Sequence, residues 1–156
     1  MRRPAGVCMH TPGQGRMRPC RRRRMRRRPP YRLYRLVNMS GAVDTSQIDI
    51  DPDQLADWRA RESDLQVIDV REPYEREAGH IADSRHIAMV ELTAQAASVQ
   101  RERPVVFYCR AGARSNMAAQ AFRAAGYEAY SMRGGLRRWA DEGRPLEPES
   151  GHVADH

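Results

Sequence analysis

The sequence predicts an α/β fold, a small and mostly parallel sheet of about five strands with helices on both faces. Two observations lead to this prediction. From about residue 47 onward, short apolar runs typical of strands alternate with helical patterns every ten residues or so, and such alternation is typical of parallel sheets. The segment 104–108 is apolar throughout, as expected for a strand that is covered on both faces.

Proline and glycine mark the ends of the elements in the first half of this pattern. A short strand at 48–50 precedes a helix that has Pro52 at its first position. A buried strand follows at 65–70, and Pro73 then begins a short helix that Gly79 ends. Proline is favoured in the first turn of a helix and glycine just beyond its last turn, so these positions indicate element boundaries.

The middle of the pattern leads to the central strand. A short strand is predicted at 85–88, and Leu92, Ala96 and Val99 then recur at helical spacing. The apolar segment 104–108 follows and is the strongest strand signal in the chain.

Two helices and one strand complete the predicted fold. A helix is expected at 115–125, with Gly126 as its stop, followed by a strand at 129–132. Gly134 and Gly135 then turn the chain into a last helix that ends near residue 143. The predicted core-facing residues of these two helices are Ala118, Ala121, Phe122, Ala125, Leu136 and Trp139.

The first 38 residues differ from the rest in charge. All 27 basic residues of the chain are arginine, and 13 of them lie in residues 1–38, which contain no acidic residue. Residues 39–156 therefore combine 14 arginines with all 20 acidic residues, a net charge of −6. An arginine-rich segment without apolar periodicity buries too little surface to offset its ordering entropy. We therefore expect a disordered tail at 1–38 and a folded domain at 39–156.

Three interpretations of this tail remain open. The change of composition at Met39 indicates a misassigned start, in which case residues 1–38 are not normally made. Alternatively, the tail is a polybasic arm for nucleic acid or anionic lipid, or an acid-free targeting peptide. The acidic balance of the domain argues against nucleic-acid binding by the domain itself. No stretch of the sequence is apolar enough to predict a membrane span.

Cys109 carries the clearest chemical signal. It directly follows the central strand, at the carboxyl end where ligands bind in such sheets. The loop N–H groups, the start of the next helix and two flanking guanidiniums all favour a thiolate, the nucleophilic form of cysteine. A buried core cysteine is the alternative interpretation, but the order of strand, cysteine, tight loop, arginine and helix favours the nucleophile. The candidate binding loop consists of Arg110, Ala111, Gly112, Ala113, Arg114 and Ser115.

Other cysteine chemistries do not fit this sequence. No second cysteine lies near Cys109, which excludes a C-x-x-C redox pair, and no paired Cys/His spacing indicates zinc. We therefore expect no metal and no cofactor. Cys8 and Cys20 lie in the predicted tail and are given no role. One unpaired reactive cysteine favours a reducing, cytoplasmic location.

Three motifs of the chain can be compared with those of known families. The most specific is residues 109–115, Cys-Arg-Ala-Gly-Ala-Arg-Ser. The other two are Asp69-Val70-Arg71-Glu72-Pro73 with Glu75 and Gly79-His80-Ile81, and Gly134-Gly135 with Trp139 and Gly143-Arg144-Pro145. In this order they resemble the motifs of single-domain rhodaneses, a family of sulfurtransferases, and residues 109–115 resemble the active-site loop of the family. The similarity extends over about residues 48–147, with one departure at Arg76, where the family usually has an aromatic residue.

The resemblance implies a sulfurtransferase reaction. Cys109 would take the outer sulfur of an anionic donor such as thiosulfate as a persulfide, and pass it to cyanide or a thiol. Four residues separate Cys109 from Arg114, whereas related phosphatases have five, which favours sulfur transfer over phosphate ester hydrolysis. The resemblance also allows a sulfur-relay or regulatory module that acts with a partner protein. Arg110 and Arg114 would attract the donor, although Arg114 could instead brace the loop.

The remaining polar residues of these motifs are given mainly structural roles. Asp69 lies at the carboxyl end of a strand and is expected to make structural hydrogen bonds, with Arg71 as a second supporting residue. Arg71 and Glu75 are four residues apart and are expected to pair at the start of a helix. Ser115 is expected to cap the following helix, and His80 to be a structural hydrogen-bonding residue.

Overall fold

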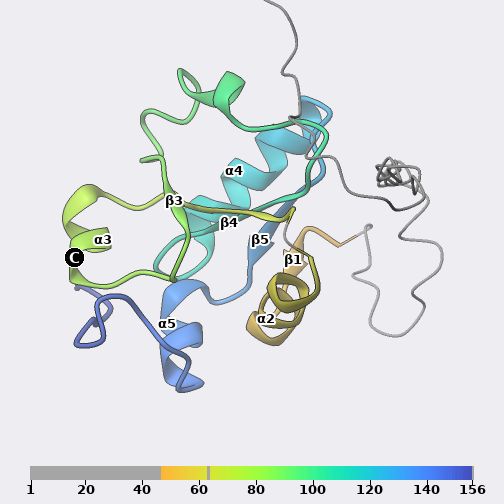
Figure 1. Ribbon diagram of the computed structural model, residues 1–156. Coiled ribbons are helices and arrows are strands. Elements are labelled where there is room, and N and C mark those ends of the chain that lie inside the picture. The colour runs from red at the N-terminus through yellow and green to blue at the C-terminus, as the bar shows by residue number, and fades with distance from the viewer. Residues whose placement is uncertain (1–46, 63, 156) are drawn as a thin grey trace, which may run out of the picture.

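The computed structural model describes residues 47–62 and 64–155, which form one five-stranded sheet flanked by helices (Figure 1). The strand order is β1-β5-β4-β2-β3, and every pairing between these strands is parallel. The predicted fold class is therefore confirmed, whereas the predicted tail at 1–38 and Met39 lie outside the described residues. The strands are β1 (Asp49–Ile50), β2 (Gln66–Asp69), β3 (Arg85–His86), β4 (Val105–Tyr108) and β5 (Ala129–Met132).

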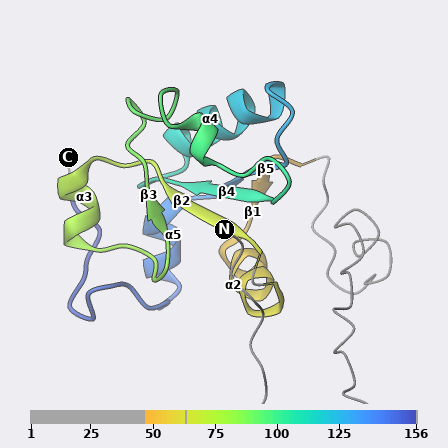
Figure 2. The ribbon, with the colours of Figure 1, turned by 45° about the horizontal axis from the view of Figure 1, so that its top comes forward.

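The helices cover both faces of the sheet. Figure 2 shows α4 on one side and α2 and α5 on the other, with α3 beside the β3 edge. Within the described part of the chain, no helix has the length and apolar character needed to cross a membrane. The helices are α2 (Pro52–Arg61), α3 (Pro73–Ala78), α4 (Ala113–Ala124), α5 (Gly135–Asp141) and a short 3₁₀ helix, η1 (Ala96–Ser98).

The central strand β4 sends alternate side chains into two buried clusters. Val105 and Phe107 join the cluster beneath α4, and Val106 and Tyr108 join the cluster beneath α2 and α5. All four residues are fully buried, as the apolar run predicted. At about 25 cal/mol per Å² of apolar surface, this two-sided burial is a main source of the stability of the fold. It also holds the carboxyl end of β4, where Cys109 follows, in a fixed position.

The predicted helical segment at 92–99 is instead a series of turns that includes only η1. Leu92 and Val99 are buried as their spacing predicted. Most hydrogen bonds in these turns join an N–H to the carbonyl three residues earlier in the chain. Examples are Ala96 N–H to the Thr93 carbonyl and Val99 N–H to the Ala96 carbonyl. The helical spacing of these apolar residues therefore did not predict an α-helix correctly, because turns of this kind can also bring apolar side chains into the core.

Helix α4 begins at Ala113, two residues before the predicted start. Its buried residues include Ala119, whereas Ala121 and Ala125, which were predicted to face the core, are exposed. The buried positions follow the i, i+3, i+4, i+7 spacing of a helix from Ser115 onward. Alanine is tolerated on either face of a helix, so an alanine-rich sequence does not identify the buried face by itself.

The C-terminal segment returns to the edge of the domain beside α3. Backbone hydrogen bonds of 2.8 Å join His80 and Glu147 in both directions, and His152 N–H donates to the Ala78 carbonyl at 2.8 Å. A side chain at Gly79 would collide with the backbone of His152, since its Cβ would lie 2.6 Å from that carbonyl oxygen. These contacts fix the path of the segment, whose end lies beside α3 in both views (Figures 1 and 2).

Candidate active site

Cys109 lies directly beyond β4 and is 2% exposed. Its Sγ accepts a hydrogen bond from Gly112 N–H at 3.1 Å and another from Ser115 Oγ at 3.6 Å. Helix α4 begins at Ala113, so its positive end lies beside the sulfur. Gly112 has a φ of +106°, a left-handed conformation that favours glycine. The local sequence therefore builds a compact cradle of donors around a single sulfur atom.

The start of α5 holds this loop from behind. Leu136 N–H donates to the Cys109 carbonyl at 2.8 Å, and Arg137 N–H donates to the Arg110 carbonyl at 3.0 Å. Gly135 has a φ of +59°, and a Cβ there would lie only 2.4 Å from the Cys109 oxygen. Gly135 is thus required for the close approach of two backbones, whereas a Cβ at Gly134 would meet the side chain of Arg138.

Ser115 is the third residue of α4 and does not cap it, contrary to the prediction. Gly112, in a left-handed conformation, occupies the cap position, because the helix begins at Ala113 rather than after Ser115. The Ser115 hydroxyl lies 3.0 Å from the Gly112 carbonyl and 3.0 Å from the Ser131 hydroxyl, and both serines are fully buried. Sequence reasoning missed Ser131, although a serine in a strand that is otherwise packed into the core was an available signal.

Arg114 forms a two-point ion pair with Glu75 of α3. Its Nη1 and Nη2 atoms donate to the two carboxylate oxygens at 2.6 and 2.7 Å. The Glu75 side chain is 1% exposed, and its hydrogen bonds with Arg114 raise the pKa of that guanidinium above its ordinary value. The arginine that ends the loop is therefore charge-compensated and braced against α3.

The pKa of Glu75 is lowered by its partners. Burial alone would raise it, but the hydrogen bonds from Arg114 and from the Glu72 N–H, at 3.0 Å, more than offset the cost of burial. Glu75 is therefore ionised at neutral pH. It links α3 to the cysteine loop across 39 residues of sequence.

Arg71 does not pair with the carboxylate of Glu75, contrary to the prediction. Its Nε and Nη2 atoms donate to the Asp69 carboxylate at 2.9 and 2.7 Å, and both side chains are fully buried. The guanidinium also donates to the carbonyls of Glu75, at 2.9 Å, and Gly79, at 2.7 Å. Arg71 precedes α3 and its side chain is buried, so the i, i+4 geometry of a helix surface does not apply. Asp69 accepts these hydrogen bonds at the carboxyl end of β2, and its structural role stays a prediction.

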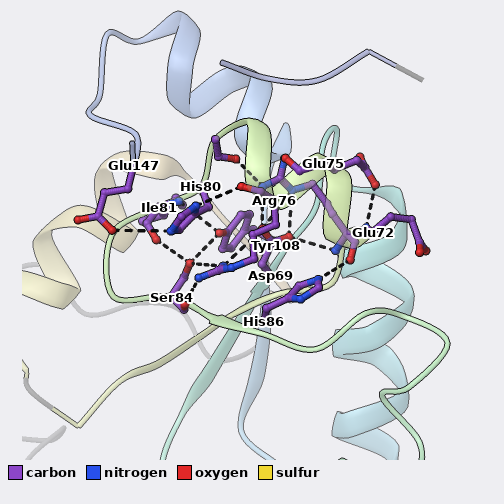
Figure 3. A network of polar contacts seen from close by, with 12 residues as sticks. Asp69, Glu72, Glu75, Arg76, His80, Ile81, Ser84, His86, Tyr108 and Glu147 are labelled. Atoms are coloured by element: carbon purple, nitrogen blue, oxygen red, sulfur yellow. Dashed lines mark hydrogen bonds and ion pairs between the residues drawn. The ribbon is translucent and has the colours of Figure 1, made fainter. Parts of the chain in front are cut away.

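A second set of polar contacts surrounds Asp69 (Figure 3). Arg76 lies 3.8 Å from the Asp69 carboxylate and donates to the Ser84 carbonyl at 2.7 Å. The Ser84 and Tyr108 hydroxyls are 2.8 Å apart, and burial raises the pKa of Tyr108, which keeps it protonated. His80 Nδ1 is 3.2 Å from the Arg76 carbonyl, in agreement with a structural role. At the position where an aromatic residue was expected, Arg76 thus makes a hydrogen bond and an ion pair.

Arg110 extends from the loop toward the C-terminal segment. Its Nη2 donates to the Asp155 carboxylate at 2.6 Å, while its Nε is buried and lacks a hydrogen-bond partner within residues 47–62 and 64–155. Ala111 and Ala113 are exposed on the loop. Asp155 was not identified from the sequence, because nothing near it in the chain indicates a partner 45 residues away.

Replacing Glu75 by glutamine is expected to make the stability of the protein less sensitive to acid. A lowered folded-state pKa means that the stabilisation by Glu75 is complete above the unfolded-state pKa of about 4.3 and is lost as the pH falls through the folded-state value. At neutral pH, loss of the charged hydrogen bonds should cost about 1.5–3 kcal/mol. Urea unfolding between pH 7 and pH 3 measures both effects.

Glu77→Gln is the matched control, because Glu77 lies in the same helix and is exposed. It should leave the acid dependence of the parent protein unchanged. If Glu75→Gln and Glu77→Gln gave the same stability profile over pH, the contribution of the buried pair to acid sensitivity would be disproved.

Comparison with known proteins places this geometry in one family. A family model for the rhodanese-like domain matches residues 51–142. A sulfurtransferase of Allochromatium vinosum is 33% identical over 104 residues, which cover 66% of this chain and 97% of the relative. The thiosulfate sulfurtransferase GlpE of Coxiella burnetii is 34% identical over 80 residues, which cover 51% and 75% of the two chains.

A solved structure agrees with these matches. The crystal structure of a rhodanese-related protein from Thermoplasma volcanium superimposes with a TM-score of 0.59 and 30% identity, over 63% of this chain and 95% of the other. The family match includes β4, the cysteine loop and α4, the elements that form the donor cradle around Cys109. The chain belongs to the rhodanese-like domain family.

Proposed function

We propose that this protein is a thiosulfate sulfurtransferase of the rhodanese type, with Cys109 as its catalytic nucleophile. The supporting observation is the cradle at the start of α4, where Gly112 N–H and Ser115 Oγ both donate to Cys109 Sγ. Donors aimed at one sulfur, together with the positive end of a twelve-residue helix, stabilise negative charge that develops on that sulfur. The relatives named sulfurtransferase support the same chemistry.

In the first step, the Cys109 thiolate attacks the outer sulfur of thiosulfate. A new S–S bond forms on Cys109, the S–S bond of the donor breaks, and sulfite leaves with the electron pair of that bond. The enzyme then carries a persulfide with a negative charge on the outer sulfur. We expect backbone N–H groups of the loop, of which Gly112 N–H already donates to Cys109 Sγ, to stabilise this charge where it develops.

In the second step, a nucleophilic acceptor attacks the outer sulfur. Cyanide forms a bond to this sulfur, the persulfide S–S bond breaks, and the thiolate of Cys109 is restored. A thiolate acceptor reacts in the same way and leaves as its own persulfide. Neither step needs an external oxidant, a metal or a bound cofactor.

The two loop arginines have different roles in this mechanism. Arg114 is paired at two points with the buried Glu75, so we assign it to bracing the loop. Arg110 lies next to Cys109 in the chain, and within the described residues its guanidinium is paired with an exposed carboxylate, that of Asp155. Arg110 is therefore the residue that attracts the anionic donor and favours the departure of sulfite.

The intact mass of the full chain after incubation with thiosulfate tests this function. Cys8 and Cys20 are first replaced by serine, so that Cys109 is the only cysteine in the chain. A gain of one sulfur atom is expected, reversed by cyanide with release of thiocyanate. Cys109→Ser in the same background should gain nothing and should transfer no sulfur.

A thiol at Cys109 that reacts with alkylating reagents but gains no sulfur would contradict thiosulfate as donor. Incubation with a protein persulfide then distinguishes a sulfur relay from an inert domain, because only a relay would load Cys109. Sulfur transfer by Cys109→Ser would disprove the role of this residue.

For the location of the protein, we propose a reducing cytoplasm, where an unpaired reactive thiol stays reduced.

A further inference from the structure

Arg110 already has an anionic partner within the chain. Its guanidinium donates to the Asp155 carboxylate at 2.6 Å, and the two side chains are 21% and 93% exposed. Arg110 follows Cys109 directly, and its carbonyl is fixed by Arg137 N–H at 3.0 Å. The residue assigned above to attract the donor is thus bound to a carboxylate in this structure.

The path of the C-terminal segment explains how Asp155 reaches the loop. The segment is tied to the edge of the domain by the hydrogen bonds of Glu147 with His80 and of His152 with Ala78. Val153 packs partly buried against the cluster beneath α5. Two residues later, Asp155 lies opposite Arg110. The anchored backbone therefore holds a carboxylate beside the cysteine loop at little additional cost in chain entropy.

A hollow of about 390 Å³ surrounds this contact. Its lining residues are Arg110, Arg137, Asp141, Val153 and Asp155. The Arg110 guanidinium retains unused donor capacity, since its Nε is buried without a hydrogen-bond partner in the described part of the chain. The hollow thus brings two arginines together with two carboxylates, those of Asp141 and Asp155. A small oxyanion that bound Arg110 there would take the place of Asp155.

We propose that Asp155 is a specificity-determining residue that competes with anionic substrates for Arg110. This inference rests on the proposed function and extends it. An oxyanion that binds the Arg110 guanidinium must displace the Asp155 carboxylate, whereas an uncharged reagent does not compete with it. Because both side chains are partly or fully exposed, the competition should weaken the selection of anions by about two- to fivefold. Asp155 thereby sets how strongly the site prefers charged over neutral substrates.

Alkylation of Cys109 tests this competition without any sulfur transfer. The thiolate displaces iodide from iodoacetate, which carries a carboxylate, or from iodoacetamide, which is neutral. Both rates are measured on the full chain with Cys8 and Cys20 replaced by serine. Asp155→Asn should raise the ratio of the iodoacetate rate to the iodoacetamide rate about threefold, and high salt should reduce this difference.

Two controls separate local competition from a general change of charge. Glu149→Gln removes an exposed carboxylate from the same segment and should leave the ratio at its parent value. In an Arg110→Gln background, Asp155→Asn should have no effect on the ratio. An unchanged ratio in Asp155→Asn, or an equal rise with and without Arg110, would overturn the role of Asp155.

Thiosulfate kinetics then distinguish this inference from the proposed function. Asp155→Asn should lower the KM for thiosulfate about threefold with kcat unchanged. A shifted alkylation ratio with no sulfur transfer would leave the role of Asp155 intact and contradict the donor. Sulfur transfer with an unchanged ratio and an unchanged KM would support the donor and disprove the role of Asp155.

Discussion

Replacing Arg71 by methionine is expected to lower the free energy of unfolding by about 3–5 kcal/mol. Arg71 and Asp69 are both fully buried and are joined by two charged hydrogen bonds. Among the described residues, the substitution leaves the Asp69 carboxylate with the hydrogen bond from the backbone N–H of residue 71, at 3.0 Å, and the longer contact to Arg76, at 3.8 Å. It also removes the donors of the Glu75 and Gly79 carbonyls. Single domains are stable by about 5–15 kcal/mol, so this loss is a large fraction of the total.

Urea denaturation followed by circular dichroism measures this loss, and Arg76→Met is its matched control. Arg76 also faces Asp69, but it is 21% exposed and its ion pair is longer. Its removal should cost about 1 kcal/mol. The double substitution Asp69→Asn with Arg71→Met should recover part of the stability, because it removes the isolated charge. Equal losses for Arg71→Met and Arg76→Met would contradict the idea that burial of the pair determines the cost.

Strong local signals allowed most of the fold to be predicted from the sequence. Pro52 and Pro73 begin α2 and α3 as expected, and the strand at Ala129–Met132 has the predicted bounds. The apolar run at 104–108 predicted the central, doubly covered strand, now seen as β4. These features depend on residues close together in the chain. The turns at 92–99 could not be predicted in the same way, because apolar spacing is compatible with both a helix and anchored turns.

The pairing of charged residues at the site was predicted poorly. Glu75 was assigned to Arg71, four residues away, but its carboxylate binds Arg114, 39 residues away. The Arg110 partner Asp155 lies 45 residues downstream. Such pairs depend on how α3, the cysteine loop and the C-terminal segment come together. A single sequence contains the charges but not this arrangement.

The cysteine loop itself was predicted better than the charged residues that pair with it. The position of Cys109 after a buried strand and before a helix predicted a sulfur surrounded by donors, and Gly112 and Ser115 both donate to it. The contribution of Ser115 differs from the expected cap, because Gly112 takes the left-handed cap position. Glycine at this point of the loop has a conformational reason that only backbone angles reveal.

A methyl group at Gly135 is expected to slow sulfur loading of Cys109 by about a hundredfold or more. The Cβ of Gly135→Ala would lie 2.4 Å from the Cys109 carbonyl oxygen and 2.6 Å from the carbonyl carbon of Arg110. These neighbours are backbone atoms, so the loop and the start of α5 must separate. The hydrogen bond from Leu136 N–H to the Cys109 carbonyl would then lengthen or break, and the cradle would lose its alignment on the sulfur.

Gly143→Ala separates this collision from backbone strain. Gly143 has a φ of +71°, similar to the +59° of Gly135, but a Cβ at Gly143 would meet no atom of the described residues within 4 Å. Gly143→Ala should therefore lose about 1–2 kcal/mol of stability from the left-handed conformation alone and load sulfur at the parent rate. Persulfide formation is timed by intact mass on samples shown by circular dichroism to be folded. Equal loading rates in the two variants would contradict a role for the α5 contact. Slow loading confined to Gly135→Ala would show that the backbone contact between α5 and the cysteine loop keeps the donors aligned on the sulfur.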